Sequence, residues 1–451
     1  MLVVFPTALL AAFGALALGF GAAPARAQDD EEVAIRAIVR DQQRDESGGT
    51  DNQPVAGVTI TVVDAEGAEI GSAVTDDEGV ADVPVPARAD YTVRLDESTL
   101  PDGITIAPNS AAEQAVSEGS FTTARRIVNF FTGESQTGDE SGFERVAQRL
   151  ADGIRLGLVI AMCAVGLSLI FGTTGLTNFA HGEMVTFGGM MAFLFNVTGI
   201  GFLGFLGFLP LVDSDGRFHL VIAALLATVA GGVFGWALNA GLFARLRRRG
   251  IGLISQMVIT VGLSILLRNM FLFQFGGRTR PLREYSLQEG IELGPITITP
   301  RDLVVTLLSL AVLVGVALSL QYTQLGKATR AVSDNPDLAS ATGIDTQKVI
   351  RIVWIAGGAL AALGGVFRGM DEQVGFEMGG RLLFLMFAAI TLGGLGNAFG
   401  ALAGGIVVGV FVEVSTLVVP TELKNAPALL ILILVLLFRP QGLLGKAQRV
   451  G

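Results

Sequence analysis

The stretch GTTGLTNFAHGEMVTFGGMMAFL, residues 172–194, decides how the rest of the chain is read. It lies in a hydrophobic region, yet it carries Asn178, His181 and Glu183 within six positions, with Gly182 among several glycines. Bilayer hydrocarbon offers no partner for a carboxylate, an imidazole or an unwound backbone amide. The pattern therefore predicts a helix broken by glycine, whose polar groups face protein or a water-filled path, as in many transporter binding sites.

The overall composition is typical of a membrane protein. Of 451 residues, 51% are hydrophobic and 16% are charged, the mean hydropathy is +0.59, and 59 glycines favour close helix packing. A spanning helix needs roughly 20 residues, so we expect a polytopic α-helical membrane protein with about 8–9 transmembrane segments, some of them broken. The net charge of −10 comes mostly from acidic residues near the N-terminus and argues against a nucleic-acid partner.

Metal and redox chemistry find little support in the sequence. The single cysteine, Cys163, cannot form an internal disulfide or a CxxC metal site. Two histidines, His181 and His219, are too few for a histidine-rich metal centre. We predict no metal, no cofactor and no catalytic residue in this chain.

The N-terminal third predicts an extracytoplasmic region. Residues 1–27 contain an apolar run and end in Ala-Arg-Ala, which indicates a signal peptide or, since no basic residue precedes the run, an anchor. Residues 33–105 hold short alternating runs separated by acidic turns, which predict a small β-sandwich. Their order resembles the prealbumin-like repeats of bacterial surface proteins. The polar residues 106–141 are expected to be a linker, with 124–131 lying on the membrane surface.

Residues 142–446 are expected to form the membrane domain. The arginine cluster at 245–249 and the basic residues after the last apolar run predict that the C-terminus is cytoplasmic. An outside N-terminus then requires an odd number of crossings. A glycine-rich segment, 382–414, predicts a second broken helix around Gly393, Gly394, Gly396 and Asn397. Its spacing echoes that of 177–195, which indicates an internal repeat or a chance likeness between glycine-rich helices.

A cytoplasmic loop carries a short capped helix. In GKATRAVSDNPDLASATG, residues 326–343, Asn335 suits the N-cap, Pro336 the first helical position and Gly343 the C-terminal side. The pattern predicts about two helical turns held off the membrane. Such a helix either fits a groove on a partner subunit or is an ordinary connector.

Three motifs carry a resemblance to a known family. FGTTGLTNFAHGEM, LGKATRAVSDNPDLASATGIDTQKV and LLILILVLLFRPQGLLG resemble permease subunits of ABC importers, in particular the high-affinity branched-chain amino acid family with its urea and amide relatives. The resemblance covers most of residues 143–446 and excludes the β-domain. It implies a multi-pass protein of a prokaryotic cytoplasmic membrane. The implied partners are a second related permease subunit or a second copy, two cytoplasmic ATPase subunits and an extracytoplasmic substrate-binding protein.

The resemblance also assigns roles by motif position. No phosphate-binding G-x-x-x-x-G-K-[ST] sequence occurs in the chain, so ATP hydrolysis must come from another subunit. The residues of the implied ATPase coupling loop are Gly326, Arg330, Asp334, Asn335, Pro336, Ala339 and Gly343. The two stretches of glycines and polar residues, and not the resemblance, give the candidate residues of the substrate pathway, which are Asn178, His181, Gly182, Glu183, Gly393, Gly394, Gly396 and Asn397.

Several alternatives stay open at this point. The polar residues of 172–194 either contact substrate or serve structure and gating, with Glu183 pairing His181 or backbone amides. The transported solute is a branched-chain or related small amino acid, or else urea or a short amide. A passive channel with an external β-domain, or a membrane receptor, are alternatives of another class.

Overall fold

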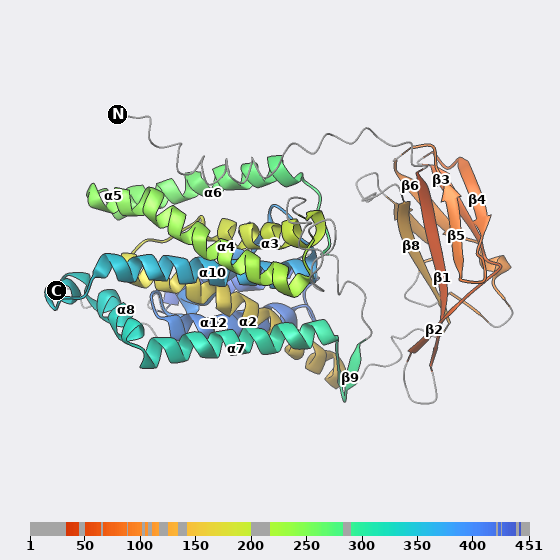
Figure 1. The fold of residues 1–451 in the computed structure, drawn as a ribbon. Coiled ribbons are helices and arrows are strands. Elements are labelled where there is room, and N and C mark those ends of the chain that lie inside the picture. Colours follow the sequence, from red (N-terminus) through yellow and green to blue (C-terminus); the bar gives the residue numbers. More distant parts are fainter. Residues whose placement is uncertain are drawn as a thin grey trace. The chain divides into compact units, whose positions relative to one another are not determined.

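The structure is a computed structural model that describes most of the chain in two compact units (Figure 1). The described residues are 33–44, 50–64, 66–87, 89–101, 104–106, 111–116, 125–133, 142–199, 217–282, 290–420, 423–424, 426–438 and 442. The predicted signal segment 1–27 and the basic C-terminal residues Arg439, Lys446 and Arg449 lie outside them.

The first unit is the predicted β-sandwich. Its described strands are β1 (Ala34–Arg44), β2 (Thr50–Pro54), β3 (Thr59–Asp64), β4 (Glu69–Val74), β5 (Val80–Pro84), β6 (Tyr91–Leu95), β7 (Glu113–Val116) and β8 (Arg125–Gly133). One sheet has the order β2-β1-β5, with β8 also paired to β1, and the other has the order β4-β3-β6-β7. Alternate residues such as Ile35 and Ile60 are fully buried between the sheets, as period-2 patterning requires.

The expectation of a linker over 106–141 is wrong for part of that range. β7 pairs with β6, and β8 pairs with β1 in parallel, so both strands belong to the sandwich. Val128 and Phe130 of β8 are buried in its core, which also contradicts a membrane-surface role for 124–131. The apolar side chains Ile127 and Phe131 on the opposite face hid the strand alternation from sequence reasoning.

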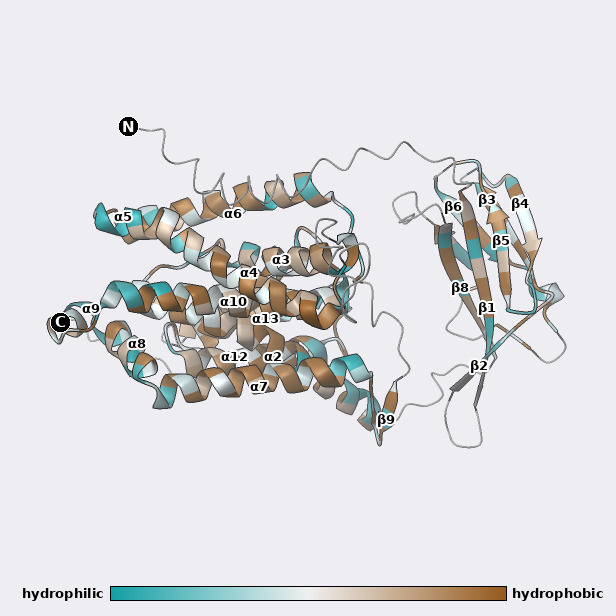
Figure 2. Cartoon of the chain, in the orientation of Figure 1, coloured by the Kyte–Doolittle hydropathy of each residue, from teal (hydrophilic) through white to brown (hydrophobic). Residues whose placement is uncertain are grey.

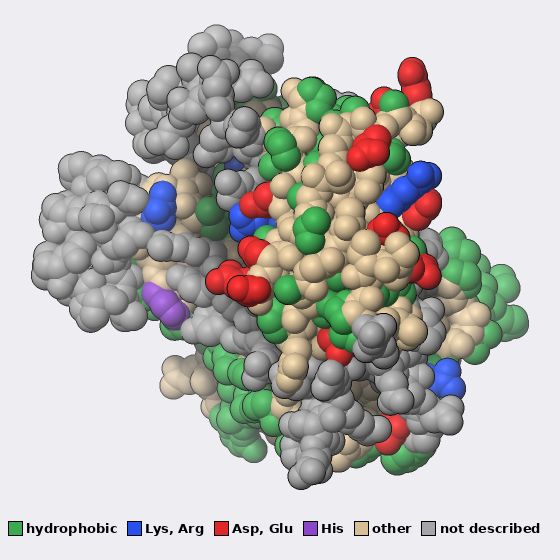
Figure 3. All heavy atoms as spheres, turned by 90° about the vertical axis from the view of Figure 1, so that its right-hand side faces the viewer, with side chains coloured by type: hydrophobic (Ala, Val, Ile, Leu, Met, Phe, Trp, Pro, Cys, Tyr) green, Lys and Arg blue, Asp and Glu red, His purple; other side chains and the backbone are tan. Residues whose placement is uncertain are grey.

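Acidic side chains are spread over the face of the β-domain that is turned toward the viewer in Figure 3. The acidic turn after β4 is satisfied by its own backbone. The Asp76 Oδ1 atom accepts the amide hydrogens of Glu78 and Val80 at 3.0 and 2.9 Å. Among the described residues no group of three or more His, Cys, Asp or Glu side chains is placed to hold a metal ion.

The second unit is a bundle of helices. The described helices are α2 (Gly142–Thr174), α3 (His181–Phe193), η3 (Leu194–Thr198), α4 (Leu220–Leu238), η5 (Asn239–Phe243), α5 (Ala244–Arg248), α6 (Leu253–Phe275), α7 (Pro300–Tyr322), α8 (Gln324–Asp334), α9 (Pro336–Ala341), α10 (Thr346–Glu372), α11 (Met378–Gly393), α12 (Ala398–Ser415) and α13 (Ala426–Phe438). Six of those within the described residues are long and apolar enough to cross a membrane, and α11 and α13 are shorter apolar helices. Hydrophobic residues dominate the bundle in Figure 2.

Burial separates central from peripheral helices. α2 and α10 have most of their apolar windows buried and pack against each other, α2 also against α12 and α10 against α3 and α4. The apolar window of α7 is only 17% buried, which suits a helix facing lipid or a partner subunit. Glycines let the central backbones approach closely, as is usual in membrane bundles.

The two ends of the bundle differ. α5, α8 and α9 lie at one end, and the hairpin of β9 (Ile291–Leu293) and β10 (Ile296–Ile298) lies at the other (Figure 1). β9 and β10 pair as an antiparallel hairpin, with Ile296 opposite Leu293. α2 begins at the hairpin end, since Gln148 near its start bonds to Thr297 of β10.

Candidate functional site

The first helix break lies inside the bundle. α2 ends at Thr174, Gly175 takes a positive φ of 68°, and α3 starts at His181. The His181 Nε2 atom lies 3.1 Å from the carbonyl oxygen of Cys163, in the interior of α2. α3 therefore begins part-way along α2, and the prediction of a broken helix in this stretch is confirmed.

The connecting turn satisfies its backbone with side chains. The buried Asn178 side-chain oxygen accepts the amide hydrogen of Ala180 at 3.1 Å. The amide of Phe179 donates to the Thr260 hydroxyl of α6 at 3.1 Å. Both bonds replace helical hydrogen bonds that the break removes, so the turn can lie at depth without exposing bare amides to hydrocarbon.

Glu183 lies in the first turn of α3 and has no exposed surface. One carboxylate oxygen accepts from the Ser264 hydroxyl at 3.1 Å and from the Arg268 guanidinium at 3.4 Å, both on α6. His181 contacts α2 instead, so the suggested His181–Glu183 pair is not formed.

Arg268 is the residue that sequence reasoning missed. It is a lone arginine in an apolar helix, and nothing local shows which partner it meets. A charge within a membrane helix is nevertheless a default indication of a functional site. That rule was the signal that would have singled it out.

Gly182 lies where α3 packs against α11. A methyl group placed on Gly182 would lie 2.6 Å from the carbonyl oxygen of Gly379, and the reverse substitution would bring a methyl group to 1.9 Å from the Gly182 oxygen. The amide of Gly379 also donates to the Thr186 hydroxyl at 3.1 Å. Only glycine fits at this crossing, so Gly182 has a packing role here.

The second break separates α11 from α12. Gly394 and Gly396 take positive φ values of 106° and 78°, and the Asn397 side-chain oxygen accepts the amide hydrogens of Phe399 and Gly400 at 3.1 and 3.2 Å. A methyl group on Gly393 would lie 1.9 Å from the carbonyl oxygen of Gly400. The segment is interrupted where the glycines predicted, but α11 and α12 pack against each other in antiparallel fashion, with Gly393 against Gly400 and Ala389 against Gly404, so the second break is a tight turn between two helices and the prediction of one broken helix is wrong.

The segment 324–345 forms two short helices. α8 is capped by Thr323, and α9 begins at Pro336 after Asn335, whose side chain accepts the Leu338 amide at 2.9 Å. Gly343 then takes a positive φ of 88°. The capped helix predicted from the sequence is confirmed in each of these details.

α8 contacts the end of α2, next to both breaks. A methyl group on Gly172 near the end of α2 would lie 2.8 Å from the Ser333 hydroxyl of α8 and 2.9 Å from the carbonyl oxygen of Gly396. The end of α2, the second break and the end of α8 therefore meet. A displacement of α8 has a direct steric route to the helix ends beside both breaks.

Comparison with known families assigns the helical unit to one of them. Residues 149–436 match the family described as branched-chain amino acid transport system, permease component. The chain belongs to this family of permeases. The match spans α2 to α13 and excludes the β-domain, as the sequence motifs implied.

Individual relatives agree with this family. The high-affinity branched-chain amino acid transport system permease protein LivH of Escherichia coli is 29% identical over 313 residues, covering 67% of this permease and 96% of LivH. LivH of Salmonella typhimurium has the same identity and coverage. The permease protein BraD of Pseudomonas aeruginosa is 28% identical over 312 residues, covering 67% and 96%. These relatives are named as permease proteins of transport systems, not as enzymes.

Only some of the predicted coupling residues are exposed at the surface of the permease. Arg330, Asp334 and Asn335 are exposed, whereas Ala339 is 4% exposed and packs against the bundle. Leu338 on α9 is 63% exposed, and the sequence analysis did not single out this large apolar side chain. Gly326 is buried where the chain turns from α7 into α8, and a methyl group there would lie 2.3 Å from the Leu320 carbonyl oxygen.

Proposed function

We propose that this permease is the translocation subunit of an ATP-driven importer for branched-chain or related small amino acids. Two cytoplasmic ATPase subunits, a second permease subunit and an extracytoplasmic binding protein complete the machine. α8 and α9 dock on an ATPase, and the breaks before α3 and α12 open the path in response. The chain itself performs no covalent chemistry.

The meeting of Ser333, Gly172 and Gly396 is the observation that carries this proposal. α8 packs against α2, α7 and α10 and ends beside both helix breaks, while Arg330 and Leu338 remain exposed. An ordinary connector between α7 and α10 would need neither feature. A partner that pushes on α8 and α9 would act on the end of α2 at Gly172, which lies beside both interruptions.

The charges of the bundle support one orientation in the membrane. The arginines of α5 lie at the same end as α8 and α9 (Figure 1). A basic cluster beside a membrane helix favours the cytoplasmic side. This orientation supports a cytoplasmic docking site for the ATPase and an extracytoplasmic β-domain preceding α2.

A charge swap tests the docking surface. We expect Arg330→Glu combined with Asp334→Arg to reduce ATP-dependent uptake roughly tenfold or more, because interface anchors contribute on that scale. The matched control is Arg94→Glu with Glu113→Arg, which swaps an exposed ion pair of the β-domain. Membrane insertion and thermal stability should be unchanged in both. Unchanged uptake with the first swap contradicts the docking role of α8 and α9.

Copurification tests the rival class of function. An importer subunit retains an ATPase through purification in mild detergent, and its uptake requires ATP. A passive channel does neither. Uptake assays with leucine and urea in the same reconstituted complex decide between the amino acid and amide substrates.

A further inference from the structure

A cavity of about 300 Å³ opens beside the Glu183–Arg268 pair. It is lined by Arg268 of α6, by Leu429 of α13, and by Glu377, Gly380, Arg381, Leu383, Phe384 and Leu385 at and after the start of α11. α11 begins at the end of the bundle opposite to α8, shortly after Val374, which pairs with Arg280 beyond α6. The cavity size is at the lower limit of ligand pockets, of about 300–1,000 Å³, and suits a small solute.

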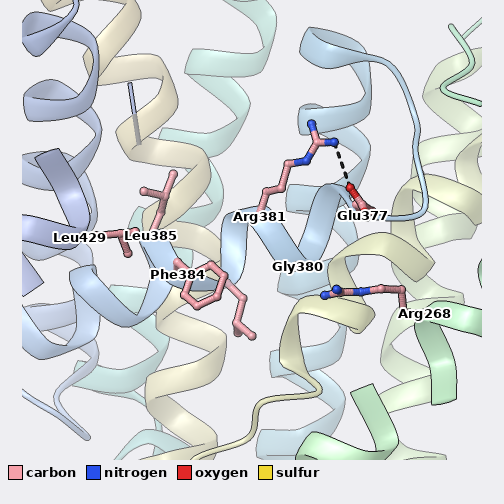
Figure 4. Close-up of a pocket in the computed structure, with 8 residues that line it drawn as sticks. Arg268, Glu377, Gly380, Arg381, Phe384, Leu385 and Leu429 are labelled. Atoms are coloured by element: carbon pink, nitrogen blue, oxygen red, sulfur yellow. Dashed lines mark hydrogen bonds and ion pairs between the residues drawn. The ribbon is translucent and has the colours of Figure 1, made fainter. Parts of the chain in front are cut away.

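The cavity has a charged end and an apolar end (Figure 4). Arg268 and the ion pair between Arg381 and Glu377, at 3.1 Å, surround Gly380. Leu385 and Leu429 lie together at the other end, with Phe384 between the two groups. This separation matches a solute that carries charges on one side and a hydrocarbon group on the other.

Arg268 is placed as a binding residue, not only as a counter-ion. Its single contact with Glu183 is 3.4 Å long, and neither the Arg268 Nε atom nor the second Glu183 oxygen has a partner among the described residues. The structural pair Arg36–Asp82 of the β-domain, by contrast, is bidentate at 2.8 and 2.6 Å. The Arg268 side chain is 39% exposed, and an arginine fork is the geometry that recognises carboxylates.

Gly380 makes room for this guanidinium. A methyl group placed on Gly380 would lie 2.2 Å from the Arg268 Nη2 atom. Glu183, which also accepts from Ser264, holds the guanidinium from the bundle side, and the bare backbone of α11 lets it reach the cavity. Glu183 is therefore a positioning residue for Arg268.

We propose that this cavity binds the transported α-amino acid as a zwitterion, an inference that rests on the proposed function. Arg268 takes the carboxylate, Glu377 takes the ammonium group, and Phe384 with the neighbouring leucines covers the aliphatic side chain. Urea and short amides lack the carboxylate that Arg268 recognises. The cavity therefore selects amino acids over these solutes within the permease itself.

Ligand analogues test this inference on the unaltered protein. The permease in lipid nanodiscs is titrated with L-leucine, L-leucinamide, 4-methylpentanoate and urea while thermal unfolding is followed. L-Leucine should raise the Tm at the lowest concentration, and each analogue lacking one charge should need at least a roughly tenfold higher concentration, since losing one charged contact costs on that scale. Equal protection by leucine and leucinamide, or no protection by leucine, overturns the proposal.

Variants then assign the carboxylate contact. Arg268→Gln and Gly380→Ala should abolish the leucine-dependent rise in Tm, and Arg268→Lys should retain part of it because the charge remains without the fork. The matched control Arg245→Gln removes an exposed arginine of α5 at the opposite end and should respond to leucine like the unaltered protein. A leucine response of Arg268→Gln equal to that of the control also overturns the proposal.

Transport assays separate this inference from the function on which it rests. If the ATPase copurifies and uptake requires ATP, while Arg268→Gln imports leucine at the unaltered rate, the cavity assignment fails and the importer stands. If no ATPase associates and uptake ignores ATP, the importer fails. The leucine titration still decides the cavity in that case.

Discussion

Both helix breaks are held in place inside the bundle, but by different contacts. At the first, buried polar side chains reach across to neighbouring helices: His181 to α2, and Glu183 to α6. At the second, glycine backbones contact each other directly, and the Asn397 side-chain oxygen accepts from the first turn of α12. The first break therefore holds a charge inside the bundle, whereas the second lets α11 and α12 approach as closely as their backbones permit.

The breaks also differ in depth. α3 starts part-way along α2, while the second break lies beside Gly172 near the end of α2. Ser333 of α8 also lies beside Gly172, so motion of α8 would reach the end of α2 directly and the second break through Gly172.

The largest expected effect on stability comes from a substitution at the second break, where α11 and α12 pack against each other. Gly393→Ala places a methyl group 1.9 Å from the Gly400 carbonyl oxygen, so α11 and α12 must separate. We expect a loss of about 3 kcal/mol or more in the free energy of unfolding, at the upper end for overpacked cores. Detergent-induced unfolding in micelles measures it.

A glycine with no other helix packed against it provides the control for Gly393. Gly315 lies inside α7 with no atom within 4 Å of an added methyl group. Gly315→Ala should leave stability unchanged or slightly raised, because alanine has the higher helix propensity. Equal losses in the two variants would show that the α11–α12 contact is not special.

The second-largest expected loss of stability comes from a substitution at the first break, which holds the buried polar side chains. Glu183→Gln removes the charge that faces Arg268. The Glu183 side chain has no exposed surface. Breaking a buried pair costs about 3–5 kcal/mol, and the partial exposure of Arg268 lowers our expectation to about 1–3 kcal/mol. Glu413→Gln, which breaks the half-exposed pair with Arg149, should cost about 1 kcal/mol or less. A cost for Glu183→Gln no larger than this control would mean that the carboxylate does not stabilise α3.

The sequence predicted features that depend on nearby residues. Glycines beside polar groups indicated both breaks, and Asn335 followed by Pro336 indicated the start of α9, because caps and positive-φ turns are set by a few neighbouring positions. The alternation of apolar and polar residues within short segments likewise predicted the β-sandwich. Family motifs supplied the identity of the helical unit.

Features that depend on distant residues were missed. Glu183 meets Arg268 only because α3 packs against α6 in one register, and the apolar sequence of α6 does not encode that register locally. Strand β8 pairs in parallel with β1 from the far end of the same domain. Burial of Ala339 likewise depends on how α9 lies on the bundle.

The smallest expected effects compare two asparagine caps. Asn397 caps α12 at the second break, and Asn335 caps α9 at the proposed docking surface. Loss of an asparagine cap typically costs about 1 kcal/mol. Asn397→Ala should show that cost in unfolding measurements, because α12 packs closely against α2 and α11 in the bundle.

Asn335→Ala should separate stability from transport. α9 is short and carries the exposed Leu338, so its fraying would leave the core almost intact while displacing the docking side chains. We expect a smaller change in unfolding than for Asn397→Ala, and a larger loss of ATP-dependent uptake. Asn335→Asp keeps an N-cap acceptor and should restore most of the uptake. If uptake instead falls in proportion to stability in both asparagine variants, the distinction between a docking helix and a packing break does not hold.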